Sequence, residues 1–418
     1  MSVILQTKSR PSPTTFVAAG EVDAVTPSAA HRPSARTVLV TELFPPTIGG
    51  SAVLFEAVYS RLDTEVAVFT DQRLAPVAES VQRGMRIVRR PIASPRWGLL
   101  NCEGFVQHVR IVHGIRTLTR GGATIVHCAR ALPEGMAALV SRRFRGPDYI
   151  CWVHGEDVSN ALSSRELTFL MKHVYRAAAA LIANSTNTAR LVENLGLPPR
   201  DIHIVHPGVD PDRFHPHVDA TKIRRQFAPS GEILLLSVAR LQRHKGHDLA
   251  IAAIGKLRDE LSDLRYLIVG DGMERARLEA LAVEHGVRDR VIFVGEVSPN
   301  DLPAYYAACD IFVLPNRIDA GNLEGFGIVF LEAASSARPA IGGSSGGVPD
   351  AVEDGVTGLL VSGTDTAELA AAIRRLTLSP ELGCRMGRAG RARVLRSFTW
   401  ERAAAAVSAL HQRLAGSR

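Results

Sequence analysis

The strongest constraint on the fold is an alternation of short apolar segments with helical segments that occurs twice along the chain. A Pro- and Gly-rich segment at 206–216 ends the first series, and the alternation starts again at 233–238. Strands that alternate with helices form parallel sheets with right-handed crossovers. The sequence therefore predicts an α/β protein with two βα domains of similar size. The predicted strands are 37–41, 66–69, 87–88, 124–127, 149–153, 180–183, 233–238, 266–269, 291–294, 311–314 and 339–341.

The predicted organisation has four parts. Residues 1–36 are rich in Ser, Thr, Pro and Ala without a sustained period, which predicts a disordered leader, with a transit-type segment as the alternative. The first βα domain is predicted at 37–210 and the second at 211–397. The last block, 398–418, contains a helix at about 399–415.

Composition excludes several classes of protein. The chain has 418 residues, of which 46% are hydrophobic and 22% charged, as in soluble globular proteins rather than disordered or fibrous ones. A net charge of +7 is modest for this length and does not imply a nucleic-acid partner. The five cysteines include no C-x-x-C pair, which favours a reduced, cytoplasmic chain without a metal site. No apolar run approaches the length of a membrane-spanning helix.

Ligands of parallel sheets bind outside the carboxyl ends of the strands, so functional residues are expected just after predicted strands. Gly49 and Gly50 follow the first strand and open a helix, which suits either a close approach to an anion or a plain tight turn. Arg240 and Lys245 follow 233–238. Two cations there can neutralise a diphosphate leaving group, and Arg243 and His244, which lie between them, can share or take over this role. The alternative is a solvated basic loop.

Two acidic residues stand out near the start of a predicted helix at 327–335. Glu324 lies in the glycine-rich loop before this helix, and Glu332 lies inside it. Carboxylates accept hydrogen bonds from paired hydroxyls, so sugar and ribose hydroxyls are candidate partners, and the backbone amides between the two residues are candidates for a phosphate. A surface acid with a second acid eight residues later is the bland alternative.

Two further features follow strands. His154 comes directly after 149–153, where a functional or a structural histidine is equally expected. The glycine-rich segment 342–350 follows 339–341 and is interpreted as a cleft wall, a hinge or a plain loop. His203 and His206 have no third ligand at a clear spacing, which argues against zinc.

The segment 81–120 carries eight arginines against the single acid Glu103. In its helical part, Phe105, Val109, Val112 and Arg116 share one face. Such a segment suits an anionic membrane surface or a phosphorylated acceptor, but an ordinary solvated helix packed on the sheet is the favoured interpretation.

Taken together, the motifs resemble those of the family-4 retaining glycosyltransferases of the GT-B fold, over residues 37–418. The resemblance implies two Rossmann-like domains that face each other across a cleft, with the last helix (398–418) crossing back to the first domain. The motifs that carry it are Phe44-Pro-Pro-x-x-Gly-Gly50, His154-Gly-Glu156, Val238-Ala-Arg240 with Lys245-Gly246, Val269-Gly-Asp-Gly272, Glu324-Gly-Phe-Gly-Ile with Glu332, Gly346-Gly-Val-Pro-Asp350, Asp354-Gly-x-x-Gly358 and Phe398-Thr-Trp400.

The resemblance also implies roles for single residues. Arg240 and Lys245 bind the donor diphosphate and act as the main catalytic groups by electrostatics. Glu324 contacts sugar hydroxyls, and His154 approaches the transferred sugar.

Other positions of the family's donor site follow in the same way. Glu332 holds the ribose hydroxyls, Val294 to Val297 lie against the base, and Gly49 and Gly50 approach the diphosphate from the first domain. The backbone amides that surround sugar and phosphate are those of Gly325, Phe326, Gly327 and Ile328.

In this family the reaction proceeds with retention and without an essential metal or other cofactor, and a leaving-phosphate oxygen takes the proton of the acceptor. The loop 316–324 resembles that of the phosphatidylinositol mannosyltransferase-like group, so GDP-mannose is the leading donor and a UDP-sugar the second. The acceptor is expected to be lipid-linked or a polysaccharide, with the enzyme cytoplasmic or peripheral on the inner face of the plasma membrane. The alternatives are a GT-B enzyme of another class, such as an epimerase or a phosphorylase-like enzyme, and a non-catalytic sugar-nucleotide-binding module.

Overall fold

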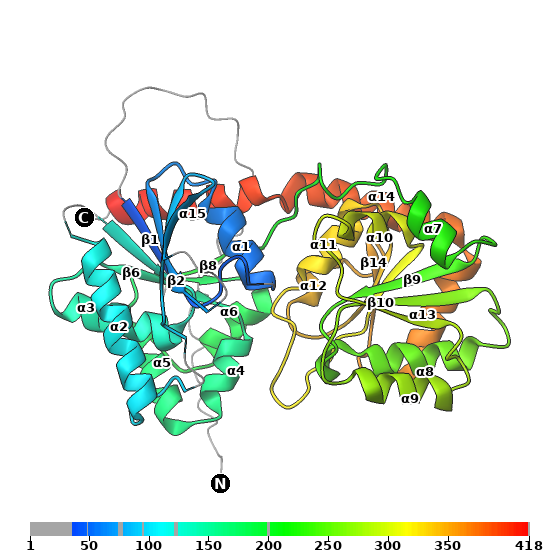
Figure 1. Ribbon diagram of the computed structural model, residues 1–418, viewed down its shortest axis with the longest axis horizontal. Helices are drawn as coiled ribbons and strands as arrows, with labels where there is room; N and C mark the ends of the chain where they lie inside the picture. Colours follow the sequence, from blue (N-terminus) through cyan, green and yellow to red (C-terminus); the bar gives the residue numbers. More distant parts are fainter. Residues whose placement is uncertain are drawn as a thin grey trace, which may run out of the picture.

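The structure is a computed structural model that describes residues 36–47, 49–73, 78–93, 96–120, 124–198 and 201–416. It contains two sheets, each surrounded by helices, that lie side by side along the chain's longest axis (Figure 1). The predicted leader lies outside the described residues except for Arg36, which begins the first strand. The domain boundaries near residues 36, 210 and 397 stay predictions.

The first sheet has eight strands in the order β3-β4-β2-β1-β5-β6-β7-β8. All neighbours are parallel except β3 and β4, which form an antiparallel hairpin at one edge. The sequence missed β3 and β8, since β3 has few apolar residues and β8 only three residues. The bounds are β1 Arg36–Thr41, β2 Val66–Asp71, β3 Glu79–Gln82, β4 Met85–Arg90, β5 Thr124–Cys128, β6 Tyr149–Val153, β7 Ala180–Ala183 and β8 Ile202–Ile204.

The second sheet has six strands, all parallel, in the order β11-β10-β9-β12-β13-β14. Five of them were predicted, whereas β14 was missed. The bounds are β9 Ile233–Val238, β10 Leu264–Val269, β11 Val291–Gly295, β12 Ile311–Leu314, β13 Ala340–Gly343 and β14 Gly358–Val361.

Helices cover both faces of each sheet, which explains why the strands are apolar throughout. In β1, Val38 and Val40 belong to one core and Leu39 to the core on the other face. In β9, Leu235 belongs to one core, and its neighbours Leu234 and Leu236 belong to the core on the other face. Strands buried on both faces lose the alternation of apolar and polar residues that marks a half-exposed strand.

The helices of the first half are α1 Gly50–Tyr59, α2 Cys102–Leu118, α3 Met136–Arg143, α4 Glu156–Leu162, α5 Arg165–Ala177 and α6 Thr186–Glu193, with a π-helical turn at Ala131–Gly135. Those of the second half are α7 Thr221–Phe227, α8 His247–Leu257, α9 Arg275–Glu284, α10 Leu302–Ala308, α11 Ile328–Ser335, α12 Val348–Ala351, α13 Thr366–Leu378 and α14 Pro380–Ser397, with a 3₁₀ turn at Arg243–Lys245. The last helix is α15, Trp400–Gly416.

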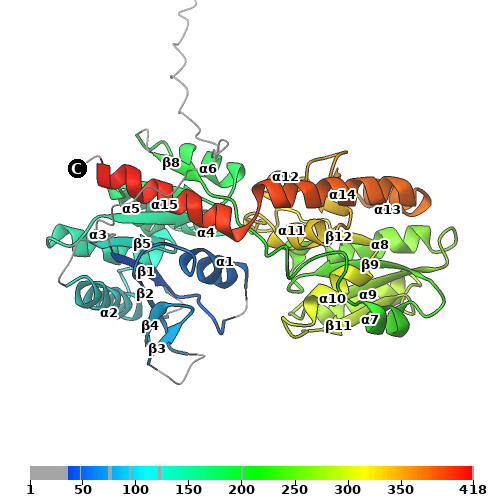
Figure 2. The same cartoon turned by 90° about the horizontal axis from the view of Figure 1, so that it is seen from above.

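Helix α15 crosses from the second sheet's side back to the first, as the resemblance implied (Figure 2). It packs beside α1 and buries Trp400, Val407 and Leu410 in a core that also contains Phe55 and Trp152. The chain therefore passes between the two halves twice, once before α7 and once between α14 and α15.

A buried chain of hydrogen bonds fixes α15 to the first sheet. Trp152 Nε1 donates to Tyr59 Oη (2.9 Å), and Tyr59 Oη lies 2.6 Å from His127 Nδ1. His127 Nε2 lies 2.7 Å from Nε2 of His411 on α15. The three contacts are satisfied when Tyr59 donates to His127 Nδ1 and the His127 Nε2–H donates to His411 Nε2, an arrangement in which both imidazoles are neutral.

This arrangement makes stability depend on pH. Burial lowers the pKa of His411 to about 4, and burial together with His411 lowers the pKa of His127 well below its usual value. In the unfolded chain histidine titrates at about 6.5. The unfolded state therefore binds more protons as the pH falls below about 6.5, and stability decreases from there to about pH 4.

We predict that His411→Leu flattens this pH dependence. The variant should lose stability at pH 7 because the buried His127 N–H loses its acceptor, which costs about 1–3 kcal/mol. Between pH 6.5 and 4.5 its free energy of unfolding should then fall less steeply than that of the wild type, by up to about 1.4 kcal/mol per pH unit for one proton. Urea unfolding at several pH values measures both effects. His113→Leu, at an exposed histidine of α2, is the control, and equal slopes for wild type and His411→Leu would contradict the prediction.

Candidate functional site

The carboxyl ends of strands from both sheets meet at the contact between the two halves. A Cβ atom on Gly325, in the loop before α11, would lie 2.5 Å from the carbonyl oxygen of His154, which follows β6. A Cβ on Gly155 would lie 3.2 Å from Leu323. The structure thus brings together two motifs that are about 170 residues apart in the sequence.

Lys245 and Glu324 form an ion pair at the carboxyl edge of the second sheet. Lys245 Nζ lies 2.6 Å from Glu324 Oε2, and both side chains are about 15% exposed. Asn316, which follows β12 and is fully buried, donates to the same oxygen from Nδ2 at 3.0 Å. Gly246 ends the 3₁₀ turn with a φ of +78°, and a Cβ there would lie 2.1 Å from the Pro315 carbonyl, so only glycine allows this position of Lys245.

The loop between Glu324 and α11 presents unpaired backbone amides. Among the described residues, no hydrogen bond comes from the amides of Gly325, Phe326, Gly327 or Ile328. The Gly347 amide holds this loop in place, because it donates to the Glu324 carbonyl at 2.9 Å. Gly346 and Gly347 would clash with this loop if they carried a Cβ, at 2.2 and 2.1 Å. The glycine-rich segment 342–350 is therefore a packed support for the loop.

The side chain of Phe326 does not face a ligand. It is 2% exposed and packs against the rings of His206 and Phe398, with centroids 5.5 and 6.0 Å away. Its backbone amide makes no hydrogen bond among the described residues, and the role that the resemblance gives this amide stays a prediction.

Glu332 lies on α11, one turn further from the pair. Its Oε2 accepts a hydrogen bond from Tyr306 Oη at 2.6 Å. Burial raises the pKa of Glu332, and the Tyr306 hydrogen bond offsets part of that rise. Val294 and Val297, at the end of β11 and beyond it, are partly exposed and pack on the same core as α11.

Arg240 is exposed, and its guanidinium makes no hydrogen bond or ion pair with another described residue, although its carbonyl accepts from the Gln242 amide. Arg243 and His244, which share this loop, differ from Arg240 in pairing and in charge. Arg243 lies 3.5 Å from Glu274, and burial, together with Lys245, lowers the pKa of His244 to about 4, which leaves His244 neutral at pH 7. Lys245 lies beside Glu324 at the start of α11, and Arg240 is the cation of this loop that no described acid pairs with.

His154 is held by its surroundings in one neutral form. Its Nε2 lies 3.0 Å from the Ala129 carbonyl, which can only accept, so Nε2 carries the proton and Nδ1 is an acceptor. Burial lowers the pKa of His154 to about 4. The ring stacks on Trp152 and meets the edge of Phe55, which fixes its orientation.

Gly49 and Gly50 lie at the start of α1, on the first-sheet side. A Cβ on Gly50 would lie 3.7 Å from Ile328 Cδ1, so α1 begins beside α11. Gly49 has a φ of +154° and open space around its Cα. Helix α1 has ten residues, and the amides of its first turn have no acceptor within the helix.

Sequence reasoning missed two residues that position the site, Asn316 and Tyr306. Asn316 lies two residues after the end of β12. The only signal for it in the sequence is that a polar residue directly follows a strand. Tyr306 lies within a helix, and nothing in its sequence context indicates a partner on α11.

Among the described residues, no group of three or more His, Cys, Asp or Glu side chains is arranged to hold a metal ion. The expectation of a metal-independent reaction stays a prediction. In the described part of the chain, no helix is both long and apolar enough to cross a membrane.

Two sequence families match the two halves: "Glycosyltransferase Family 4" over residues 48–213 and "Glycosyl transferases group 1" over 219–393. A GDP-mannose-dependent alpha-(1-6)-phosphatidylinositol monomannoside mannosyltransferase of Mycolicibacterium smegmatis is 30% identical over 385 residues, which cover 89% of this chain and 97% of that protein. The chain belongs to glycosyltransferase family 4. It is a glycosyltransferase, and the family resemblance is confirmed.

A further relative and a solved structure are also similar over most of the chain. A D-inositol 3-phosphate glycosyltransferase of Streptomyces scabiei is 30% identical and covers 87% of this chain and 86% of its own. Sucrose-phosphate synthase from Thermosynechococcus elongatus has the same fold, with a TM-score of 0.78 at 24% identity over 92% of this chain and all of that one. The predicted GT-B architecture is confirmed.

Proposed function

We propose that this family-4 enzyme transfers a hexose, with retention, from a nucleoside-diphosphate sugar to a lipid-linked or polysaccharide acceptor in envelope glycan synthesis. The observation that carries the proposal is the Lys245–Glu324 pair beside the four unpaired amides at the start of α11. GDP-mannose is the leading donor and a UDP-sugar the second. The relative from M. smegmatis, described as GDP-mannose-dependent, supports this order.

In this proposal, the diphosphate lies between Arg240, Lys245 and the α11 amides. Lys245 has three N–H donors, so it can keep its bond to Glu324 and donate to a phosphate oxygen as well. The Arg240 guanidinium has no competing partner among the described residues. The amides add the partial positive charge of a helix N-terminus, and Gly49 and Gly50 bring the start of α1 to the other side.

The rest of the donor meets acceptor oxygens and apolar surface. Glu324 would hold sugar hydroxyls, and Glu332 would hold the ribose hydroxyls in exchange for Tyr306. Val294 and Val297 offer apolar contact for the base. Nδ1 of His154, kept unprotonated by the Ala129 bond of Nε2, would accept from a hydroxyl of the transferred sugar.

The chemistry needs no protein base in this arrangement. The bond between the anomeric carbon and the diphosphate oxygen breaks, the acceptor oxygen forms its bond on the same face, and a leaving-phosphate oxygen takes the acceptor's proton. Arg240 and Lys245 stabilise the negative charge that develops on the diphosphate, because fixed cations in a partly buried site do so without reorganisation.

We also propose peripheral membrane contact through the first half of the chain. On α2, Phe105, Val106 and Val109 are about half exposed, beside Arg110 and Arg116. The charge of 81–120 is smaller at the surface than the sequence suggested. Arg89 is buried, and other arginines of the segment pair with acids: Arg83 with Glu56, Arg86 and Arg90 with Glu79, and Arg96 with Glu103.

Lys245→Ala should reduce kcat by about 10²–10³-fold, because one electrostatic contact to the leaving group contributes about 2.7–4 kcal/mol. Transfer from radiolabelled GDP-mannose to a crude lipid extract measures the effect. Lys256→Ala, at an exposed lysine on α8, should keep wild-type turnover. Full turnover by Lys245→Ala would exclude the proposed role.

Nucleoside diphosphates should stabilise the protein in the order GDP, UDP, ADP. At a concentration of 100 Kd, a ligand that binds only the folded state adds about 2.7 kcal/mol to stability. Thermal unfolding with each nucleotide gives the order. A shift with UDP or ADP and none with GDP would overturn the donor assignment.

Vesicles of phosphatidylcholine and phosphatidylglycerol (7:3) should bind the protein, and vesicles of phosphatidylcholine alone should not. Each arginine near an anionic surface contributes about 1 kcal/mol, so Arg110→Gln with Arg116→Gln should lower binding about thirtyfold. Arg375→Gln with Arg385→Gln, on the exposed side of α13 and α14, is the matched control. Equal sedimentation of both variants with the mixed vesicles would contradict this surface.

A further inference from the structure

A pocket of about 240 Å³ lies at the carboxyl edge of the first sheet, apart from the donor residues described above. Glu42, Asp71 and Arg73 supply its polar wall, and Leu43, Phe44 and Pro46 supply its apolar wall. It is smaller than the roughly 300–1,000 Å³ of sites for drug-sized ligands, so it suits one small ring rather than a long chain.

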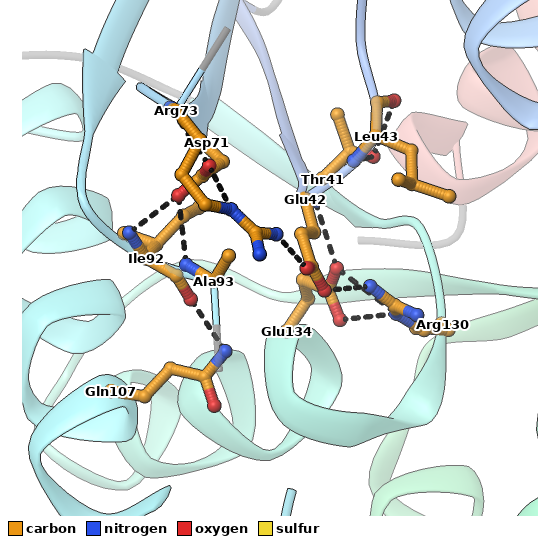
Figure 3. Close-up of polar contacts among 10 residues, drawn as sticks. All are labelled: Thr41, Glu42, Leu43, Asp71, Arg73, Ile92, Ala93, Gln107, Arg130 and Glu134. Atoms are coloured by element: carbon orange, nitrogen blue, oxygen red, sulfur yellow. Dashed lines mark hydrogen bonds and ion pairs between the residues drawn. The ribbon is translucent and has the colours of Figure 1, made fainter. Parts of the chain in front are cut away.

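The polar wall is held by a network of ion pairs (Figure 3). Glu42 bridges two arginines: its Oε1 lies 2.6 Å from Arg73 Nη2 and its Oε2 lies 2.5 Å from Arg130 Nη2. Arg130 also pairs with the buried Glu134, at 3.2 Å, and that carboxylate accepts from the Glu42 amide at 3.1 Å. The guanidinium of Arg130 lies 4.7 Å from the ring centre of Trp97.

Asp71 is equally fixed. Its Oδ1 accepts from the amides of Ile92 and Ala93 at 3.0 and 2.8 Å, and its Oδ2 accepts from the amide and Nε of Arg73 at 3.0 and 2.8 Å. Of these side chains Arg73 alone reaches far into solvent, at 63% exposure, whereas Glu42 is 13% exposed. The wall therefore presents hydrogen-bonding groups in a fixed geometry before any ligand arrives.

The charges of the network decide which ligand it suits. Three carboxylates (Glu42, Asp71 and Glu134) face two guanidinium groups (Arg73 and Arg130), and both arginines are already paired. An anion would meet no unpaired cation here and would be repelled by Glu42. A neutral polyol can accept from Arg73 and donate to Glu42 without disturbing either ion pair, and its apolar ring face can lie on the exposed Leu43 and Pro46.

The position of the pocket relates it to the transfer reaction. The loop that lines it from Glu42 to Thr47 leads to Gly49 and Gly50, where α1 begins beside Ile328. On the other side, Arg130 follows Ala129, whose carbonyl holds His154. One loop and one strand end thus connect the pocket with the first-half residues that face the donor.

We propose that this pocket binds an uncharged, polyhydroxylated ring of the acceptor, with Glu42 and Arg73 as its specificity-determining residues. This inference rests on the proposed glycosyl transfer and adds to it the chemical class that the acceptor presents. Any phosphate or lipid of the acceptor then lies outside the pocket.

The test measures ring binding directly. Saturation-transfer NMR in the presence of GDP gives the affinity of myo-inositol and methyl α-mannoside for the full chain. Glu42→Gln and Arg73→Gln should each weaken the binding of at least one of these rings tenfold or more. Arg36→Gln and Glu65→Gln remove another Arg–Glu pair of the same domain, at the opposite end of β1, and should change it less than twofold. Arg73 is exposed, so Arg73→Gln should stay folded and give a ring affinity even if Glu42→Gln unfolds the protein.

Inorganic phosphate tests the opposite possibility, that the pocket binds an anion. If phosphate displaces the rings and Arg73→Gln abolishes that displacement, the pocket is an anion site and the inference is wrong. Unchanged ring affinity in both pocket variants, or no ring binding at all, also overturns it. Hydrolysis of GDP-mannose by water and the thermal shift with GDP separate this result from a failure of the proposed function, since both should persist in Arg73→Gln.

Discussion

The candidate site depends on the close approach of two backbone segments from the two halves of the chain. Gly325 lies against the carbonyl of His154, and a single added carbon would overlap that oxygen. Behind Gly325, the residues Gly346 and Gly347 pack as closely on the Glu324 loop. Three layers of backbone without side chains between them bring the carboxyl edges of both sheets within reach of one small ligand.

Two connections hold this arrangement in place. The chain crosses before α7 and again before α15, and α15 is fixed to β5 by the bond between His411 and His127. At the domain contact itself, Asp350 accepts from the Thr186 amide at 2.5 Å and lies 3.1 Å from His206 Nε2. The segment Gly346–Asp350, which packs on the Glu324 loop, therefore also joins the second half to the start of α6.

Charge is distributed differently at the two edges that face each other. The second sheet presents Arg240 and Lys245 next to free amides, which suits a diphosphate. The first sheet presents arginines that are already paired with Glu42, Asp71 and Glu134. A donor that is anionic and an acceptor ring that is neutral at its reacting end would each meet a surface of matching chemistry, which limits binding in the wrong orientation.

The sequence by itself determined the two parallel sheets, because strands buried on both faces leave continuous apolar runs such as 149–153 that alternate with helices. It also indicated Arg240, Lys245, Glu324 and His154, since each follows a strand. Only the tertiary structure decided which groups meet. Lys245 and Glu324 are 79 positions apart, and Glu42 and Arg130 are 88 apart. No local pattern encodes such pairs, because they arise from the order of strands in the sheet and from close backbone packing between the two halves.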